Sequence, residues 1–193
     1  MPPARAFGPQ NPAVRLTPPR VSRILLVGFM GSGKSAVGRR LAALMDWRFL
    51  DMDAEVEAEA DRPVPEIFRD EGEARFRELE AEVARGLLQR DRVVIASGGG
   101  WPCVPGRMEK LPEGTLAVWL RVSPEEAVRR VRSGVTPRPL LEVDEPLRRA
   151  RELLDARKPF YGKAHWKVQT EGRSSDAVAG ELQARFERDV WSR

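Results

Sequence analysis

The feature that most constrains this chain is a glycine-rich segment at residues 28–35. It reads Gly-Phe-Met-Gly-Ser-Gly-Lys-Ser and fits the pattern G-x-x-x-x-G-K-[ST] at every fixed position. An apolar, strand-like run (Arg23–Val27) precedes it and an amphipathic segment (Lys34–Met45) follows, which is the context that the pattern requires. Glycines let backbone N–H groups converge on anionic oxygens, and a helix N-terminus adds partial positive charge. The segment, called the P-loop below, therefore predicts binding of a nucleoside triphosphate.

Two side chains of the P-loop have predicted roles of their own. Lys34 should reach the β- and γ-phosphates, and the Ser35 hydroxyl should bind Mg²⁺. The loop alone does not distinguish a kinase from a GTPase or a motor, so the reaction has to be inferred from the other motifs.

Strand-like and helix-like segments alternate after residue 22. This pattern predicts an α/β fold in which helices cover both faces of a parallel sheet, with ligands at the carboxyl ends of the strands. The predicted strands are Arg23–Val27, Arg48–Asp51, Arg92–Ala96, Thr115–Val122 and Trp166–Gln169. The predicted helices are Lys34–Met45, Ala54–Ala60, Val64–Asp70, Glu73–Gln89, Pro124–Arg132, Leu147–Tyr161 and Ser175–Val190. Residues 1–22 are rich in proline and are expected to be a flexible tail, and residues 23–193 form one domain.

Composition excludes several classes of protein. The net charge is +4, but acidic and basic residues are interleaved without a long Lys/Arg block, which argues against a nucleic-acid-binding protein. No apolar run approaches the ~20 residues that a membrane-spanning helix needs. The single cysteine, Cys103, cannot form an internal disulfide, which fits a cytoplasmic location, and we interpret it as a small apolar filler.

Two aspartates follow the second predicted strand. Asp51 and Asp53 should face the same side if the backbone stays extended, and no acid follows the strand Val93–Ala96, where a magnesium-associated carboxylate often lies. Asp51 is therefore the candidate for the magnesium shell. Asp53 has two possible roles: it could bind a substrate hydroxyl and accept its proton, or it could only cap a helix that begins at Ala54.

Three further features admit either a structural or a functional interpretation. Arg77 and Glu80 are spaced i,i+3 on a helix, which is typical of a solvated surface pair but could also orient Arg77 toward a substrate carboxylate. Residues 98–100 are all glycine, as in a tight turn or in a ligand-lined wall. The segment at about 133–146 contains Arg138 and could be an exposed loop or a lid that closes over ATP.

Together these segments resemble the shikimate kinase family from about Arg23 to the chain end. The shared pieces are the P-loop, FLDMD at Phe49–Asp53, EIF at Glu66–Phe68, FRELE at Phe76–Glu80, GGG at Gly98–Gly100, RPLL at Arg138–Leu141 and RKPFY at Arg157–Tyr161. Many nucleotide-binding proteins have a P-loop, whereas the other motifs at these spacings are far more selective.

The resemblance implies a fold, a reaction and a set of site residues. The fold would be a five-stranded parallel sheet in the order 2-3-1-4-5 with a lid, as in nucleoside monophosphate kinases. The reaction would be transfer of the γ-phosphate of ATP to the 3-hydroxyl of shikimate, with Mg²⁺ as cofactor, in a monomer with no nucleic-acid or membrane partner. The implied catalytic residues are Lys34, Asp53 and Arg138, and the implied metal-associated residues are Ser35 and Asp51. The implied ATP-binding residues are Gly31, Ser32, Gly33, Lys34, Ser35, Ala36, Arg130, Arg138 and Arg173. The implied acceptor-binding residues are Asp53, Phe76, Arg77, Gly98, Gly99, Gly100 and Arg157.

The chain departs from the family pattern just after the glycine triplet. Small residues are usual there, whereas this chain has Trp101-Pro102-Cys103, and Trp101 could either reshape the acceptor pocket or point into the core. A gluconate-type kinase is the alternative enzyme, although it lacks the GGG and RPLL motifs. A nucleotide-binding regulatory protein without catalytic activity is the alternative of another class, and the intact motif residues argue against it.

Overall fold

The computed structural model describes residues 21–133, 139–141 and 143–191. Residues 1–20 of the predicted tail, and with them residues 134–138 and 142 of the predicted lid, lie outside this description, so Arg138 does too. Within the described part, no helix is both long enough and apolar enough to span a bilayer.

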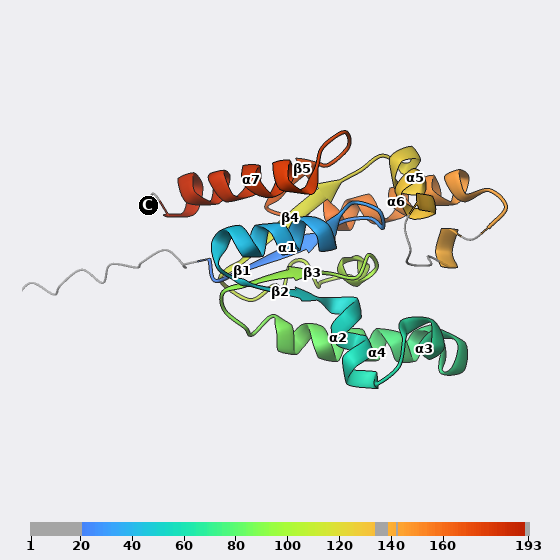
Figure 1. Cartoon of the computed structure of the whole chain (residues 1–193). Coiled ribbons are helices and arrows are strands. Elements are labelled where there is room, and N and C mark those ends of the chain that lie inside the picture. Colours follow the sequence, from blue (N-terminus) through green and yellow to red (C-terminus); the bar gives the residue numbers. More distant parts are fainter. Residues whose placement is uncertain (1–20, 134–138, 142, 192–193) are drawn as a thin grey trace, which may run out of the picture.

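A five-stranded parallel sheet in the order β2-β3-β1-β4-β5 forms the centre of the domain (Figure 1). The strands are β1 (Arg23–Val27), β2 (Arg48–Asp51), β3 (Val93–Ala96), β4 (Thr115–Arg121) and β5 (Trp166–Gln169). Every residue of β1 and β3 is buried, as a parallel sheet covered on both faces requires. The predicted sheet and strand order are confirmed.

Two layers of helices cover the sheet, and each layer uses alternate residues of the strands. Ile24 and Leu26 of β1 belong to a cluster that includes residues of α1 (Lys34–Met45) and α7 (Ser175–Phe186). Leu25 and Val27 belong to the opposite cluster. That cluster includes residues of α4 (Gly72–Leu87), α5 (Pro124–Ser133) and α6 (Pro146–Tyr161). The strand period of two therefore divides the core between the two faces.

A smaller lobe lies at the edge of the sheet next to β2. It contains α2 (Met52–Ala60), α3 (Val64–Asp70) and α4, which Figure 1 shows below the sheet. Its own apolar cluster contains Val56, Ile67, Phe76 and Leu79. Because Phe76 is only 5% exposed in this cluster, most of its ring packs in the core and only a small part can line a pocket.

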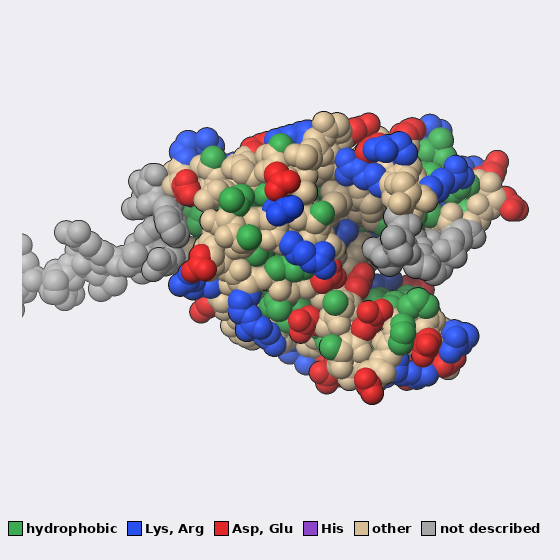
Figure 2. All heavy atoms as spheres, viewed as in Figure 1, with side chains coloured by type: hydrophobic (Ala, Val, Ile, Leu, Met, Phe, Trp, Pro, Cys, Tyr) green, Lys and Arg blue, Asp and Glu red, His purple; other side chains and the backbone are tan. Residues whose placement is uncertain are grey.

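Short elements complete the chain, and charges are spread over its surface. A 3₁₀-helix, η1 (Trp101–Cys103), follows the glycine triplet, a second one, η2, spans Pro139–Leu141, and a π-helical turn, η3 (Glu187–Trp191), follows α7. Figure 2 shows acidic and basic side chains intermingled over the face in view, as the interleaved sequence predicts. Most helix boundaries match the predicted ones, several differ by one or two residues, and the end of α7 differs by four.

Candidate active site

The P-loop folds as the sequence predicts, between β1 and α1. Gly31 and Gly33 have φ angles of 73° and 88°, a left-handed conformation that side chains disfavour, and Gly33 is the residue before the first turn of α1. A Cβ atom on Gly31 would also lie 2.9 Å from the carbonyl oxygen of Ala127. The Lys34 ammonium donates hydrogen bonds to the carbonyl oxygens of Gly28 (3.0 Å) and Phe29 (3.1 Å), and so it lies across the loop. The loop thus has the shape and charge of a phosphate cradle.

Ser35 and Asp51 come together beside the P-loop. The Ser35 hydroxyl donates a 2.5 Å hydrogen bond to Asp51 Oδ2. The described residues contain no cluster of three or more His, Cys, Asp or Glu side chains that could hold a metal ion by themselves. Mg²⁺ in kinases needs no such cluster, because it takes most of its ligands from substrate phosphates and water and only one or two from the protein. The Ser35–Asp51 pair therefore fits a magnesium ion that arrives with a nucleotide.

The structure corrects the prediction for the two aspartates. Helix α2 begins at Met52 rather than Ala54, so Asp53 is in the first helical turn and not on an extension of the strand. The N-cap is Asp51, whose Oδ1 accepts a hydrogen bond from the backbone N–H of Asp53 (3.2 Å). The interpretation of Asp53 as a helix cap is therefore wrong, because Asp51 has that role and the Asp53 carboxylate is not needed for it.

The glycine triplet is where three parts of the site meet. A Cβ on Gly98 would collide with Glu80 Oε1 and would lie 2.9 Å from Asp53 Oδ1. One on Gly99 would lie 3.6 Å from Arg157 Nη1 and 3.8 Å from the backbone nitrogen of Met30 in the P-loop. One on Gly100 would lie 2.9 Å from both terminal nitrogens of Arg77. The triplet is therefore a wall against which other groups pack closely, and larger residues would displace them.

Arg77 and Glu80 form an ion pair that is not a solvated surface pair. Arg77 Nη1 donates a 2.9 Å hydrogen bond to Glu80 Oε2, and the Glu80 side chain is only 1% exposed. Burial raises the pKa of Glu80 because it disfavours the charged carboxylate, and the charge of Arg77 only partly offsets this. The other edge of Arg77 binds Glu73 on the outer side of α4. The Arg77 side chain is 28% exposed, and its guanidinium is held in place at the glycine triplet.

Arg157 approaches the same wall from α6. Its guanidinium lies over the ring of Phe29 in the P-loop, with 5.9 Å from Cζ to the ring centroid. One helical turn later, the Tyr161 hydroxyl donates a 2.6 Å hydrogen bond to the carbonyl oxygen of Gly99. Burial raises the pKa of Tyr161, so this hydroxyl keeps its proton and remains a donor. Sequence reasoning did not assign Tyr161 a role, although its i,i+4 spacing from Arg157 places both on one face of α6.

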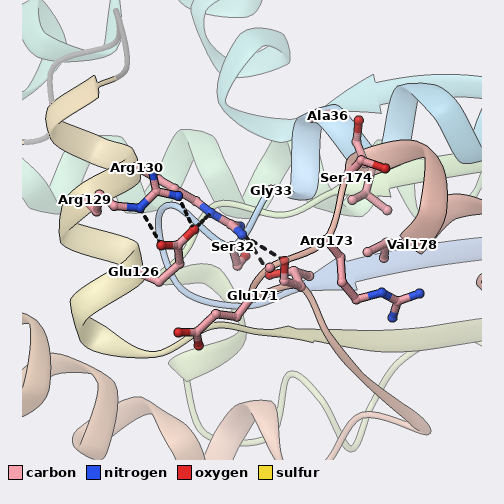
Figure 3. Close-up of a pocket in the computed structure, with 14 residues that line it drawn as sticks. Ser32, Gly33, Ala36, Glu126, Arg129, Arg130, Glu171, Arg173, Ser174 and Val178 are labelled. Atoms are coloured by element: carbon pink, nitrogen blue, oxygen red, sulfur yellow. Dashed lines mark hydrogen bonds and ion pairs between the residues drawn. The ribbon is translucent and has the colours of Figure 1, made fainter.

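A cavity of about 640 Å³ adjoins the P-loop and the start of α1 (Figure 3). Arg130 crosses it, donating hydrogen bonds to the carbonyl oxygens of Gly31 (3.2 Å) and Thr170 (2.8 Å). Glu126 lies between Arg129 and Arg130 in Figure 3, and their hydrogen bonds lower its pKa to about 2. The lining residues are Ser32, Gly33, Ala36, Val37, Glu126, Arg129, Arg130, Thr170, Glu171, Gly172, Arg173, Ser174, Ser175 and Val178. The cavity adjoins the start of α1, where the remainder of a nucleotide bound to the P-loop would lie.

The remaining sequence predictions have mixed outcomes. Arg173 lines the cavity of about 640 Å³, but its guanidinium turns toward α7, where it pairs with Glu181 (2.6 Å). Trp101 is 4% exposed and packs in the core, so it does not reshape the acceptor pocket through direct exposure. Cys103 is a free, partly buried thiol 3.8 Å from the carbonyl oxygen of Gly99, at the edge of the wall rather than in a purely apolar setting.

The chain is similar to several known proteins in sequence and in fold. A sequence model of the family described as shikimate kinase matches residues 30–187. A curated shikimate kinase from Thermus thermophilus is 39% identical over 180 residues, which cover 93% of this chain and 98% of that protein. The solved structure of a shikimate kinase from Acinetobacter baumannii in complex with shikimate is 35% identical with a TM-score of 0.81, covering 89% of this chain and 97% of that one. A gluconokinase structure from Sinorhizobium meliloti is 20% identical with a TM-score of 0.58 over 90% of this chain and 96% of that one, a likeness of fold alone.

Proposed function

The chain belongs to the shikimate kinase family, and from this premise we propose that its site transfers the γ-phosphate of ATP to the 3-hydroxyl of shikimate, giving shikimate 3-phosphate. One observation carries the proposal: the glycine triplet joins the phosphate cradle to a two-arginine wall. Gly99 faces both Met30 of the P-loop and Arg157, and Gly100 faces Arg77. A nucleotide in the cradle and an organic acid held by the arginines would therefore lie next to each other.

The acceptor side of the site suits a polyhydroxylated carboxylate. Arg77 and Arg157 would bind the carboxylate, and a planar guanidinium can do so with two parallel hydrogen bonds. Asp53, whose Oδ1 lies against Gly98, would accept a hydrogen bond from the attacking hydroxyl and orient it or take its proton. Fixing the acid at one end and the hydroxyl at the other would align the hydroxyl with the γ-phosphorus, and such positioning is a major source of catalysis in phosphoryl transfer.

The nucleotide side supplies positive charge. Lys34 and the P-loop N–H groups would neutralise charge on the transferred phosphoryl group. Ser35 and Asp51 would hold Mg²⁺, and the ion would supply positive charge to the phosphate oxygens of ATP. Arg130 and Arg173 would line the adenine side, and Arg138 would contact ATP from the lid. We further propose that the enzyme acts in the cytoplasm as a monomer on two small molecules, without nucleic acid or membrane.

The proposed function is tested by ADP release coupled to NADH oxidation. With ATP–Mg²⁺, we expect ADP release to depend on shikimate and to remain at background with gluconate or with no acceptor. Mass spectrometry of the product should show a monophosphate of shikimate. Equal rates with and without shikimate, or a preference for gluconate, would disprove the assignment.

Glu80→Gln should separate stability from function. The raised pKa means that the folded protein binds a proton at Glu80 more tightly than the unfolded chain does, so ionising Glu80 costs stability. The wild-type free energy of unfolding therefore contains a contribution that falls as pH rises above 4.5 through the folded pKa, and the variant lacks it. At pH 7 we expect the variant to unfold at the wild-type temperature or above, while its KM for shikimate rises about tenfold because Arg77 loses its buried partner.

Urea unfolding of both proteins between pH 4 and pH 8 checks the stability part of this prediction. The free energy of unfolding of the variant, relative to that of the wild type, should increase as pH rises. A variant that loses stability relative to the wild type over this range would contradict the sign derived from the Glu80 pKa. Glu78→Gln is a matched control, because Glu78 lies on the same helix with a 64% exposed side chain and should change neither quantity.

A further inference from the structure

The buried carboxylate of Glu80 has fewer hydrogen-bond partners than a buried charge normally needs. Its Oε2 accepts from Arg77, but its Oε1 is buried without a hydrogen-bond partner among the described residues. Asp53 lies nearby, and its negative charge raises the pKa of Glu80 further. An ionised, buried carboxylate normally needs several partners, since the loss of hydration costs several kcal/mol. Arg77 alone is a poor sole partner, because the function proposed above also requires its charge for the substrate carboxylate.

A second cation approaches Glu80 from the segment after the glycine triplet. Arg107 Nη1 lies 3.8 Å from Glu80 Oε2, which is an ion pair rather than a hydrogen bond. The Arg107 side chain is 19% exposed, so solvent screens this pair less than an open surface pair. The two side chains stabilise each other's charged forms: Arg107 lowers the pKa of Glu80, and Glu80 raises the pKa of Arg107. Burial acts in the opposite direction on both groups and is the larger effect.

Trp101 holds Arg107 in this position. The Arg107 guanidinium lies over the Trp101 ring, 5.3 Å from the ring centroid, and Nη1 donates a 3.1 Å hydrogen bond to the Trp101 carbonyl oxygen. The ring itself is fixed in the core, where Trp101 is 4% exposed. The unusual tryptophan after the glycine triplet therefore has a consequence for the site, although its ring does not enter the acceptor pocket.

We propose that Arg107, held on the face of Trp101, is a positioning residue that shares the charge of Glu80 and thereby keeps Arg77 aimed at the substrate carboxylate. The inference rests on the proposed function. When Arg77 binds the substrate carboxylate, its positive charge is divided among that group, Glu73 and Glu80. Arg107 compensates Glu80 at this stage, so that the Arg77–Glu80 hydrogen bond and the orientation of Arg77 persist in the complex. Because Arg107 acts through Glu80 and Arg77, its effect should be confined to acceptor affinity.

The decisive variant is Arg107→Met, which keeps an apolar side chain against Trp101 and removes the charge. Steady-state kinetics should show a shikimate KM raised about tenfold, with kcat and the KM for ATP within about twofold of wild type. Arg107→Lys retains the charge without the planar stack and should recover part of the affinity. In a Glu80→Gln background, Arg107→Met should raise the shikimate KM no further, since the group through which it acts is absent.

Arg85→Met is the matched control. Arg85 lines the same cavity of about 400 Å³ as Arg107 but is exposed on α4 and makes no ion pair with a described residue. It should leave the shikimate KM unchanged. An unchanged KM in Arg107→Met, or effects of Arg107→Met and Glu80→Gln that simply add, would overturn the proposal.

A variant that does not fold and a failure of the proposed function are distinguishable from a failure of this inference. If circular dichroism shows that Arg107→Met does not fold, Arg107→Lys replaces it. Its shikimate KM is then compared with and without Glu80→Gln, and additive effects would again overturn the proposal. A wild-type enzyme without shikimate-dependent ADP release would instead refute the proposed function, and that result is distinguishable because it precedes any variant.

Discussion

Replacing Lys34 with methionine is expected to lower kcat for shikimate phosphorylation by roughly 10²–10³-fold. The ammonium is the only charged side chain within the P-loop itself, at residues 28–35, and it already lies across the loop on the carbonyl oxygens of Gly28 and Phe29. Negative charge on the γ-phosphoryl oxygens is redistributed as the bond to ADP breaks, and a positioned cation stabilises that state more than the bound ATP. Methionine has similar length but no charge, so packing is largely kept.

Single-turnover quench-flow with ATP–Mg²⁺ and saturating shikimate would measure this effect on the chemical step itself. Lys110→Met is the control, because Lys110 is exposed and lies remote from the P-loop beside the cavity that Arg85 lines. It should retain wild-type turnover. Near-normal turnover in Lys34→Met would remove the phosphate role of the P-loop lysine.

The second large effect is expected from Asp53→Asn, with a fall in kcat of roughly 10²–10³-fold and a much smaller change in the KM for shikimate. Asparagine keeps the size and one hydrogen-bond acceptor but cannot take a proton or attract the hydroxyl with a full charge. Helix α2 should remain intact, because its N-cap is Asp51 and Asp53 contributes only its backbone N–H to the cap. Loss of rate without loss of fold is therefore the expected result.

The matched control for this variant is Asp61→Asn at the other end of α2. Asp61 is the C-cap residue and has a φ of 51°, a conformation that asparagine adopts readily. Kinetics and thermal unfolding should both remain near wild type. If Asp53→Asn instead lost stability in proportion to activity, or kept its kcat while only KM rose, Asp53 would have a structural or binding role rather than a role in the chemical step.

Local sequence patterns predicted the secondary structure well because the determining residues are adjacent in the chain. The apolar runs of β1 and β3 require burial on both faces, and the spacing of Val37, Leu41 and Ala42 places the apolar stripe of α1. The predicted start of α2 was wrong because one residue has two roles. Asp51 can serve as the last strand residue and as the helix cap at once, and a pattern that treats these roles as exclusive places the helix two residues late.

Site residues were harder to predict than elements. The sequence interpretation of the Arg77–Glu80 spacing favoured a solvated surface pair, because most helical pairs at this spacing are exposed. Packing of α4 against the glycine triplet excludes water from Glu80, and nothing in the spacing of the two residues indicates this. Tyr161 and Arg107 were not assigned roles for the same reason, since their partners are defined only once α6 and the segment after η1 are placed.

What the sequence determined by itself is the phosphate cradle. Its eight residues are contiguous, its glycines permit the required backbone angles locally, and the strand before and the helix after it supply the context. The tertiary structure alone decided which charges are buried and which groups meet. Gly99 and Tyr161 are 62 residues apart, and Gly31 and Arg130 are 99 residues apart. Burial and electrostatic interaction depend on distance in space, and chain spacing does not report that distance until the sheet brings the segments together.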